Sequence, residues 1–230
     1  MSADRTDCHR LLALAVHELR TPVSVATGYV RMVLQFHGQA LSEDGRKFLT
    51  EAARSSTRLA ALLSEMSDLS NLIAGHIPLR SDDVAIFSMA AEVAAGMRDG
   101  EERGVRVEAS GADPAVRVSG DGHWLRASLR ALVAATLRER VQPGVLRLEC
   151  RHVRAARQRR AVLAIGDEDA AGALASLPPS RWGPFDQWRG GVGFTLPLAV
   201  HVIAAHGGRL GSFPGAPARA AVALALPLKE

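Results

Sequence analysis

A histidine, a glutamate, an arginine, a threonine and a proline stand together in the stretch LAVHELRTPVSVATGYV, residues 13–29. The carboxylate of Glu18, next to His17, can hold one ring nitrogen as N–H and leave the other neutral and nucleophilic. Thr21 follows His17 by one helical turn, so it shares the helix face and could position a water molecule. Pro22 lacks an N–H and bends a helix beside the ring. A lone histidine on such a face would be an ordinary surface residue, but this grouping indicates nucleophilic chemistry at His17.

The residues around this cluster predict two long helices. Apolar residues recur at alternating spacings of four and three, which is the heptad pattern of packed helices. Gly38 interrupts the pattern, and Ser42 is a suitable N-cap for a second helix that ends before Gly75 and Pro78. The first seam is Leu12, Val16, Leu19, Val23, Ala26, Val30 and Val33, and the second is Phe48, Ala52, Ser55, Leu59, Leu62, Met66, Leu69 and Ile73. Two such helices form an antiparallel hairpin, whose remaining apolar surface predicts a homodimer with a four-helix bundle.

From about residue 82 the sequence alternates helices with short strands. Helices are expected at 82–104, at 121–140 with Asp121 as the opening residue, and at 195–206. Strands are expected twice within 105–120 and at 145–153, 159–167, 206–213 and 220–228, with a Gly- and Pro-containing loop before the last helix. The predicted fold class is therefore α+β. A helical hairpin at residues 1–78 precedes a two-layer α/β sandwich at residues 79–230.

Composition restricts the function classes. The chain has 230 residues, 47% hydrophobic and 23% charged, which is typical of a globular protein. Its net charge of +4 and pI near 9.8 are those of many nucleic-acid-binding proteins, but the basic stretch at 151–160 reads as a solvated hairpin turn. No aromatic residues are interleaved there to stack on bases, so we expect no nucleic-acid partner.

We expect no membrane segment and no metal site. The apolar runs are too short to cross a bilayer, and Arg20 interrupts the only candidate for a signal peptide, so a cytoplasmic location is predicted. Cys8 and Cys150 show neither a disulfide nor a metal-binding pattern, and the histidines lack the spacing of metal ligands.

The sequence HELRTP resembles the phosphoacceptor box of sensor histidine kinases. Residues 58–79 are similar to the second helix of that family's dimerisation domain, 121–140 to the N-box helix, and the end of the chain to the end of the ATP-binding domain. The resemblance implies that His17 carries a phosphoryl group and that Glu18 orients it. It further implies that Arg20 and Thr21 handle the phosphoryl group during transfer or dephosphorylation, and that Arg20 and Pro22 contact a partner.

The N box departs from the family pattern. Aligned with that pattern, Ala131 and Ala135 stand where the family has asparagines, one of which coordinates Mg²⁺. Alanine offers no oxygen to a hard cation. Arg138 matches the usual basic residue of the helix and could still meet a phosphate.

The two glycine boxes depart as well. In DEDAA, Asp167 matches the family's aspartate that accepts a hydrogen bond from the adenine amine, although an ordinary aspartate in a loop would look the same. Asp169 and Ala171 stand where the family has glycines. In GGVGFTLPL, Gly191 and Gly193 remain from the loop that cradles phosphates, and the mobile lid before it is almost absent. These losses predict impaired use of ATP and Mg²⁺, the cofactors that the resemblance implies.

Three functions remain open at this point. The first is a phosphotransfer protein whose His17 is charged by an upstream kinase or by a response regulator receiver domain. The second is an active ATP-dependent histidine kinase with an unorthodox site at Arg138, Asp167, Gly191 and Gly193. The third is a non-enzymatic scaffold that binds a receiver domain through the hairpin.

Overall fold

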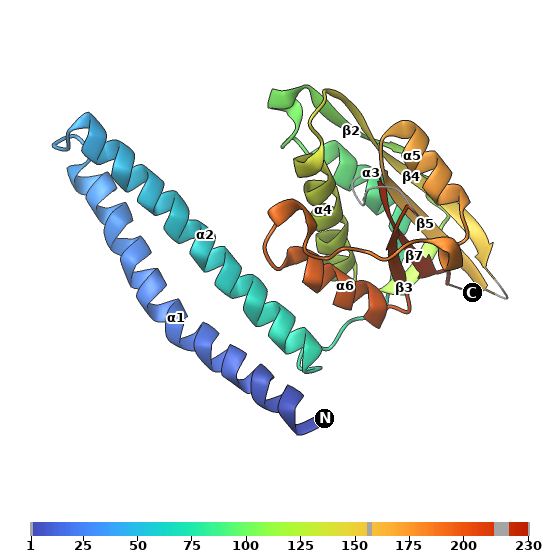
Figure 1. The fold of residues 1–230 in the computed structure, drawn as a ribbon, viewed down its shortest axis with the longest axis horizontal. Coiled ribbons are helices and arrows are strands. Elements are labelled where there is room, and N and C mark those ends of the chain that lie inside the picture. Colours follow the sequence, from blue (N-terminus) through green and yellow to red (C-terminus); the bar gives the residue numbers. More distant parts are fainter. Residues whose placement is uncertain (1, 156–157, 214–220, 230) are drawn as a thin grey trace. The chain divides into compact units, whose positions relative to one another are not determined.

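The computed structural model describes residues 2–155, 158–213 and 221–229, and the chain divides into two compact units, Met1–Ile77 and Pro78–Glu230 (Figure 1). The first unit is helical, and the second combines helices with two β-sheets. The predicted α+β class, with a helical hairpin before an α/β domain, is confirmed.

The first unit consists of two long helices, α1 (Ser2–His37) and α2 (Glu43–Ile73). The side chain of Ser42 caps α2 by accepting a hydrogen bond from the Gly45 N–H at 3.2 Å. Beyond α2, Gly75 has a φ of 72°, a left-handed conformation that suits glycine and ends the helix. Both predicted helices and the predicted cap are confirmed.

The heptad seams are only partly buried within one hairpin. Val16 on α1 and Leu63 on α2 are 3% and 7% exposed, whereas Leu19 and Phe48, both at predicted seam positions, are 51% and 69% exposed. The large apolar side chains described as exposed on the hairpin are Leu11, Leu14, Leu19, Val25, Tyr29, Met32, Phe36, Phe48, Leu59 and Ile73. A single hairpin therefore leaves an extensive apolar surface in contact with water.

A five-stranded sheet forms the centre of the second unit, with strand order β2-β4-β5-β7-β6. Its strands are β2 (Val105–Ser110), β4 (Gly144–Ala155), β5 (Gln158–Gly166), β6 (Arg209–Ser212) and β7 (Ala221–Pro227). β2 and β4 are parallel, and the other neighbours are antiparallel. Residues 156 and 157, at which the sequence predicts a hairpin turn, lie outside the described residues, as does the side chain of Cys8.

Helices cover both faces of this sheet (Figure 1). α3 (Ile86–Gly96), α4 (Gly122–Glu139) and α6 (Thr195–Ala205) lie on one face, and α5 (Glu168–Ser176) lies on the other. The predicted helices at 121–140 and 195–206 are confirmed.

The helix predicted at 82–104 is wrong at its start. Its first residues form the strand β1 (Asp82–Ala85), which pairs with β3 (Arg117–Gly120) in a separate two-stranded sheet. Val84 and Val118 are partners in this pairing and are 7% and 1% exposed, so cross-strand burial outweighs the local helical preference. The two strands predicted within 105–120 exist, but they belong to different sheets.

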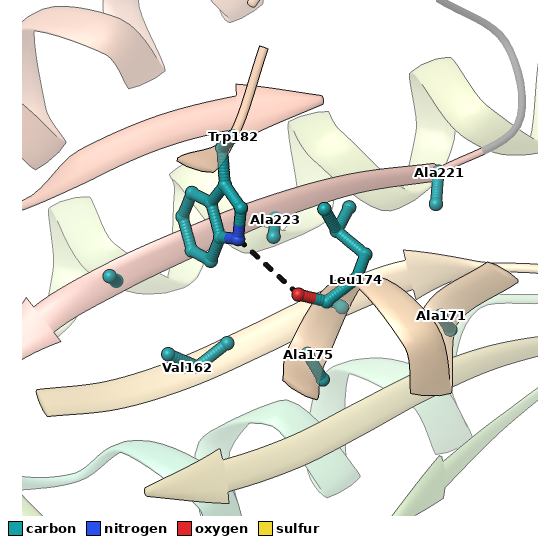
Figure 2. Close-up of a cluster of buried hydrophobic side chains, with 9 residues drawn as sticks. Val162, Ala171, Leu174, Ala175, Trp182, Ala221 and Ala223 are labelled. Atoms are coloured by element: carbon teal, nitrogen blue, oxygen red, sulfur yellow. Dashed lines mark hydrogen bonds between the residues drawn. The ribbon is translucent and has the colours of Figure 1, made fainter. Parts of the chain in front are cut away.

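The loop predicted after Asp167 is also wrong, because its first part is the helix α5. Ala171, Leu174 and Ala175 follow each other at helical spacing and are fully buried against the sheet. The indole N–H of Trp182 donates to the Leu174 carbonyl at 3.3 Å and closes the cluster (Figure 2). α5 thus adds a third layer to the predicted two-layer sandwich.

Asp121 fixes the start of α4. Its carboxylate accepts hydrogen bonds from the backbone N–H groups of His123, Trp124 and Arg80 at 3.0, 3.3 and 3.1 Å. Burial raises the pKa of this carboxyl, but the three N–H groups and the Arg80 guanidinium outweigh burial and hold the pKa below its ordinary value of 3.8. The backbone N–H of Asp121 in turn donates to His206 Nε2 at 2.9 Å, which ties α4 to the end of α6.

Candidate functional site

His17 projects from the exposed side of α1. Its side chain is 79% exposed, although the preceding Val16 is 3% exposed and packs inside the hairpin. His17 Nδ1 lies 3.3 Å from Glu18 Oε1. Because a carboxylate can only accept, this contact keeps the proton on Nδ1 and leaves the Nε2 lone pair available. The structure therefore presents one oriented ring nitrogen without a hydrogen-bond partner among the described residues.

The other predicted residues of this box lie near His17 because they follow it on the same helix. Arg20, Thr21 and Pro22 are exposed, and Thr21 lies one turn beyond His17 on the same face. Pro22 lies inside α1 without ending it, and its missing N–H leaves the Glu18 carbonyl without its helical donor. The hairpin thus gathers all five residues on one accessible segment.

A nearly buried ion pair lies in the region predicted to bind a nucleotide. The Arg189 guanidinium contacts the Glu139 carboxylate, with Nε at 3.0 Å from Oε2, and the two side chains are only 4% and 15% exposed. Arg189 begins a 3₁₀ turn, Arg189–Gly191, and Glu139 ends α4. The pair therefore fixes the turn against the helix that the resemblance makes the N box.

The same turn packs directly on one of the two alanines in the N box. A β-carbon added to Gly190 would lie 3.0 Å from the Cα and Cβ of Ala135, and Gly190 has a φ of 70°. Ala135 is 1% exposed and Ala131 is 8% exposed. Both alanines are thus buried, and the turn packs against Ala135.

The remaining predicted nucleotide residues also have partners within the chain. Arg138 Nη1 donates to the Gly191 carbonyl at 2.9 Å, and Asp167 pairs with the Arg140 guanidinium. Gly191 and Gly193 have φ values of 56° and 78°, conformations that favour glycine. The structure therefore brings Arg138 and Gly191 together, but it pairs Asp167 with a cation.

A small cavity lies between these pairs. Its volume is about 220 Å³, below the roughly 300–1,000 Å³ of most small-molecule sites. It is lined by Thr136, Glu139, Arg140, Val141, Gln142, Leu146, Gly166 and Asp167. On its far side, Asp169 lies in the first turn of α5, and Ala171 is fully buried. The two glycine replacements therefore belong to a helix of the fold, where backbone cannot approach a nucleotide as a flexible loop could.

Sequence reasoning missed Glu139, Arg140 and Arg189. Each is an ordinary charged residue in the sequence, and Glu139 and Arg189 are separated by 50 positions. No local spacing indicates that they pair. Among the described residues, no group of three or more His, Cys, Asp or Glu side chains could hold a metal ion. Burial raises the pKa of the Cys150 thiol to about 12, which keeps it protonated and unreactive.

Residues 9–75 match the His Kinase A (phospho-acceptor) domain. The chain is 26% identical over 209 residues to the sensor protein DivL of Caulobacter vibrioides, an alignment that covers 86% of this chain and 26% of DivL. Its fold is similar to that of full-length ShkA, solved in complex with AMPPNP, with a TM-score of 0.71 and 21% identity over 95% of this chain and 46% of ShkA. The Acinetobacter baumannii histidine kinase AdeS gives a TM-score of 0.58 and 16% identity over 93% and 98% of the two chains.

The matched domain and the fold are those of two-component signalling proteins. Residues 9–75 therefore match the kind of phosphoacceptor domain that the HELRTP box predicted, and most of the chain is similar to sensor histidine kinases. It spans only about a quarter of DivL and less than half of ShkA. Within the described ranges, no helix is both long and apolar enough to span a bilayer.

Proposed function

We propose that this chain is a cytoplasmic phosphotransfer protein in which His17 accepts a phosphoryl group and donates it to the receiver domain of a response regulator. The observation that carries the proposal is a contrast in pairing. His17 is 79% exposed and contacts Glu18, whereas Arg189 and Glu139, in the region predicted to bind a nucleotide, form a pair whose side chains are only 4% and 15% exposed. ATP use is therefore impaired, and His17 is charged by a receiver domain or an upstream kinase.

The chemistry is an in-line displacement at phosphorus. His17 Nε2 attacks the aspartyl phosphate of a receiver domain, the N–P bond forms, and the aspartate carboxylate leaves with the electron pair of the broken P–O bond. Glu18 accepts the Nδ1–H and stabilises the positive charge that develops on the ring. The reverse reaction uses the same groups and returns the phosphoryl group to a carboxylate.

The neighbouring residues have supporting roles. Arg20 is exposed and can pair with the transferred phosphoryl group. Thr21 positions a water molecule when the outcome is dephosphorylation, and Pro22 contributes to the surface that the receiver contacts.

A homodimer would cover the apolar surface of the hairpin. Large side chains such as Tyr29, Phe36 and Phe48 are at least 63% exposed in one chain. Packing two hairpins as a four-helix bundle removes such groups from water, at roughly 25 cal/mol per Å² of apolar surface. The exposed flank that carries His17 would remain accessible to the receiver.

The residues of the nucleotide region do not fit Mg²⁺ and ATP. Arg138, Asp167, Gly191 and Gly193 are the residues that would hold the nucleotide, yet Arg138 and Asp167 already have partners. Ala131 and Ala135 offer no metal ligand, and the Gly190 turn covers Ala135. The cavity beside Glu139 is small, at about 220 Å³, and Glu139 is held by Arg189 in a pair that is costly to separate.

An active kinase remains the second candidate. The retained Asp167, Arg138, Gly191 and Gly193 favour it, as does the similar fold of ShkA, which was solved with AMPPNP. A scaffold that binds a receiver without using His17 is the third candidate. It predicts receiver binding that is unaffected by loss of the imidazole.

Phosphotransfer from a donor tests the proposal. The chain is mixed with a receiver domain that has been labelled through a small phosphodonor, and acid-labile label on the chain is followed over time. We expect label on the wild type and on His37→Ala, whose histidine is exposed on the same helix, but none on His17→Ala. Label that persists in His17→Ala, or receiver binding without any transfer, would contradict the proposal.

A further inference from the structure

A basic groove lies at the end of the sheet that is remote from the nucleotide region. It consists of two cavities, of about 670 and 350 Å³, that share His152, Arg159, Leu228 and Lys229. Arg154 lines the larger cavity only and Arg117 the smaller only, so cations stand along the whole groove. We call this feature the basic groove.

Two arginines of the basic groove stand directly opposite each other. Arg154 on β4 pairs with Arg159 on β5 in the antiparallel register, so their side chains leave the sheet on the same face. Like charges in opposed positions destabilise a sheet. Neither guanidinium has a hydrogen-bond or ion-pair partner within the described ranges, and the same holds for Arg117 on β3. Such unrelieved repulsion is a local cost that an anionic ligand would remove.

The charge of the chain is concentrated on the same unit. The hairpin, residues 1–77, has eight Lys and Arg and eight Asp and Glu, whereas residues 78–230 have 20 and 16. The entire net charge of +4 therefore belongs to the second unit. Along β5, Arg159 and Gly166 are about 24 Å apart at the rise of a strand, so the basic groove is separate from the cavity beside Asp167.

The walls of the basic groove distinguish among anionic ligands. Val116 and Leu228 provide an apolar floor between the cations, and the lining of the two cavities contains no Phe, Tyr or Trp to stack on bases. At one end of the groove Asp83 pairs with Lys229 at 3.3 Å, and Asp113 adds a second carboxylate. The cations without a partner among the described residues are therefore confined to a short stretch, which suits a few carboxylates better than a continuous phosphate backbone. An acidic peptide with apolar side chains satisfies both the cations and the floor.

We propose that the basic groove docks an acidic, apolar-containing segment of a protein partner. This interaction uses the second unit and needs neither His17 nor a nucleotide. Its location also differs from the helix flank on which a receiver would meet His17.

The test measures binding of a short fluorescein-labelled peptide of alternating glutamate and valine to the full chain. We expect the affinity to fall about tenfold when Arg154 and Arg159 are both replaced by glutamate, and to weaken with salt. Arg106→Glu is the matched control. Arg106 is exposed on β2 and pairs with Val145, about 30 Å along β4 from Arg154, so the affinity of this variant should be unchanged.

The single variant Arg154→Glu gives a readout that does not depend on the double variant folding. It converts an opposed like-charge pair into an opposite-charge pair, so the Tm should rise by about 1–3 °C while peptide affinity falls. Equal peptide affinity in the wild type and in Arg154→Glu would overturn the proposal. Tighter binding of an oligothymidylate with the same number of charges would also overturn it, since the ligand would then be a nucleic acid.

Discussion

The hairpin and the nucleotide region differ in the exposure and pairing of their polar side chains. On α1, His17 is exposed and its only described contact is the one that orients it, with Glu18. At the end of α4, Glu139 is nearly buried, and its carboxylate is satisfied by Arg189. A reactive group needs to be accessible and oriented, whereas a charged group that stabilises a fold is paired and buried. This difference in pairing is the structural basis of the roles proposed for the two regions.

Breaking the buried ion pair should have the largest effect on stability. Arg189→Ala leaves the Glu139 carboxylate nearly buried without a partner, so we expect a loss of about 3 kcal/mol in the free energy of unfolding of the second unit. Urea denaturation followed by tryptophan fluorescence measures this loss. Replacing both residues with apolar ones of similar size should recover most of it, and an Arg189→Ala variant as stable as the wild type would show that the pair does not stabilise this unit.

Restoring the asparagine at the N box should not restore ATP binding. Ala135 is packed so tightly against the turn that even a β-carbon on Gly190 would lie 3.0 Å from it, so Ala135→Asn must fit a polar amide into a crowded, buried place. We expect the free energy of unfolding to fall by about 2 kcal/mol, with no gain in affinity for Mg·ATP. Calorimetric titration with AMPPNP measures the affinity. Ala134→Asn, half-buried on the same helix, is the control for the added amide. Tight binding by Ala135→Asn would mean that the missing oxygen alone disables the site.

Removing the orienting carboxylate should slow transfer without abolishing it. Glu18→Gln keeps the shape of the side chain but weakens the stabilisation of the charged ring, and we expect transfer at His17 to slow about tenfold, which corresponds to about 1.4 kcal/mol. Single-turnover transfer from a labelled receiver measures the rate. Glu51→Gln, an exposed glutamate on α2, should leave the rate unchanged.

The smallest expected effect depends on pH. Because the pKa of the Asp121 carboxyl is lowered in the folded chain, its stabilisation is present above the unfolded pKa of about 3.9 and is lost as the pH falls through the lower folded value. Asp121→Asn should cost about 1 kcal/mol at neutral pH and flatten the loss of stability below pH 4. The hairpin has no part in this contact, so the helical signal of residues 1–77 should show no matching change. If Asp121→Asn lost stability below pH 4 as steeply as the wild type, the assignment of this pH dependence to Asp121 would be contradicted.

The predictable parts of this molecule are those in which the signal is local. Heptad spacing and the Ser42 cap define α1 and α2 because side chains three and four apart share a helix face. The HELRTP box is recognisable for the same reason, since its five functional residues lie within six positions and need no tertiary information.

The parts that escaped prediction depend on contacts between distant residues. β1 becomes a strand because Val84 meets Val118, 34 positions later. α5 was read as a damaged glycine box, although Glu168 and Asp169 in its first turn are typical of a helix start. The pairing of Glu139 with Arg189 has no local pattern, and only the fold reveals it.

Incubation of the purified chain with γ-labelled Mg·ATP tests the central claim most directly. A labelled receiver domain serves as the donor in a parallel reaction, and His17→Ala is tested with both donors. We predict acid-labile label on His17 from the receiver and none from ATP. Acid-labile label that comes from ATP and disappears in His17→Ala would contradict the claim, because the chain would then charge His17 with its own nucleotide site.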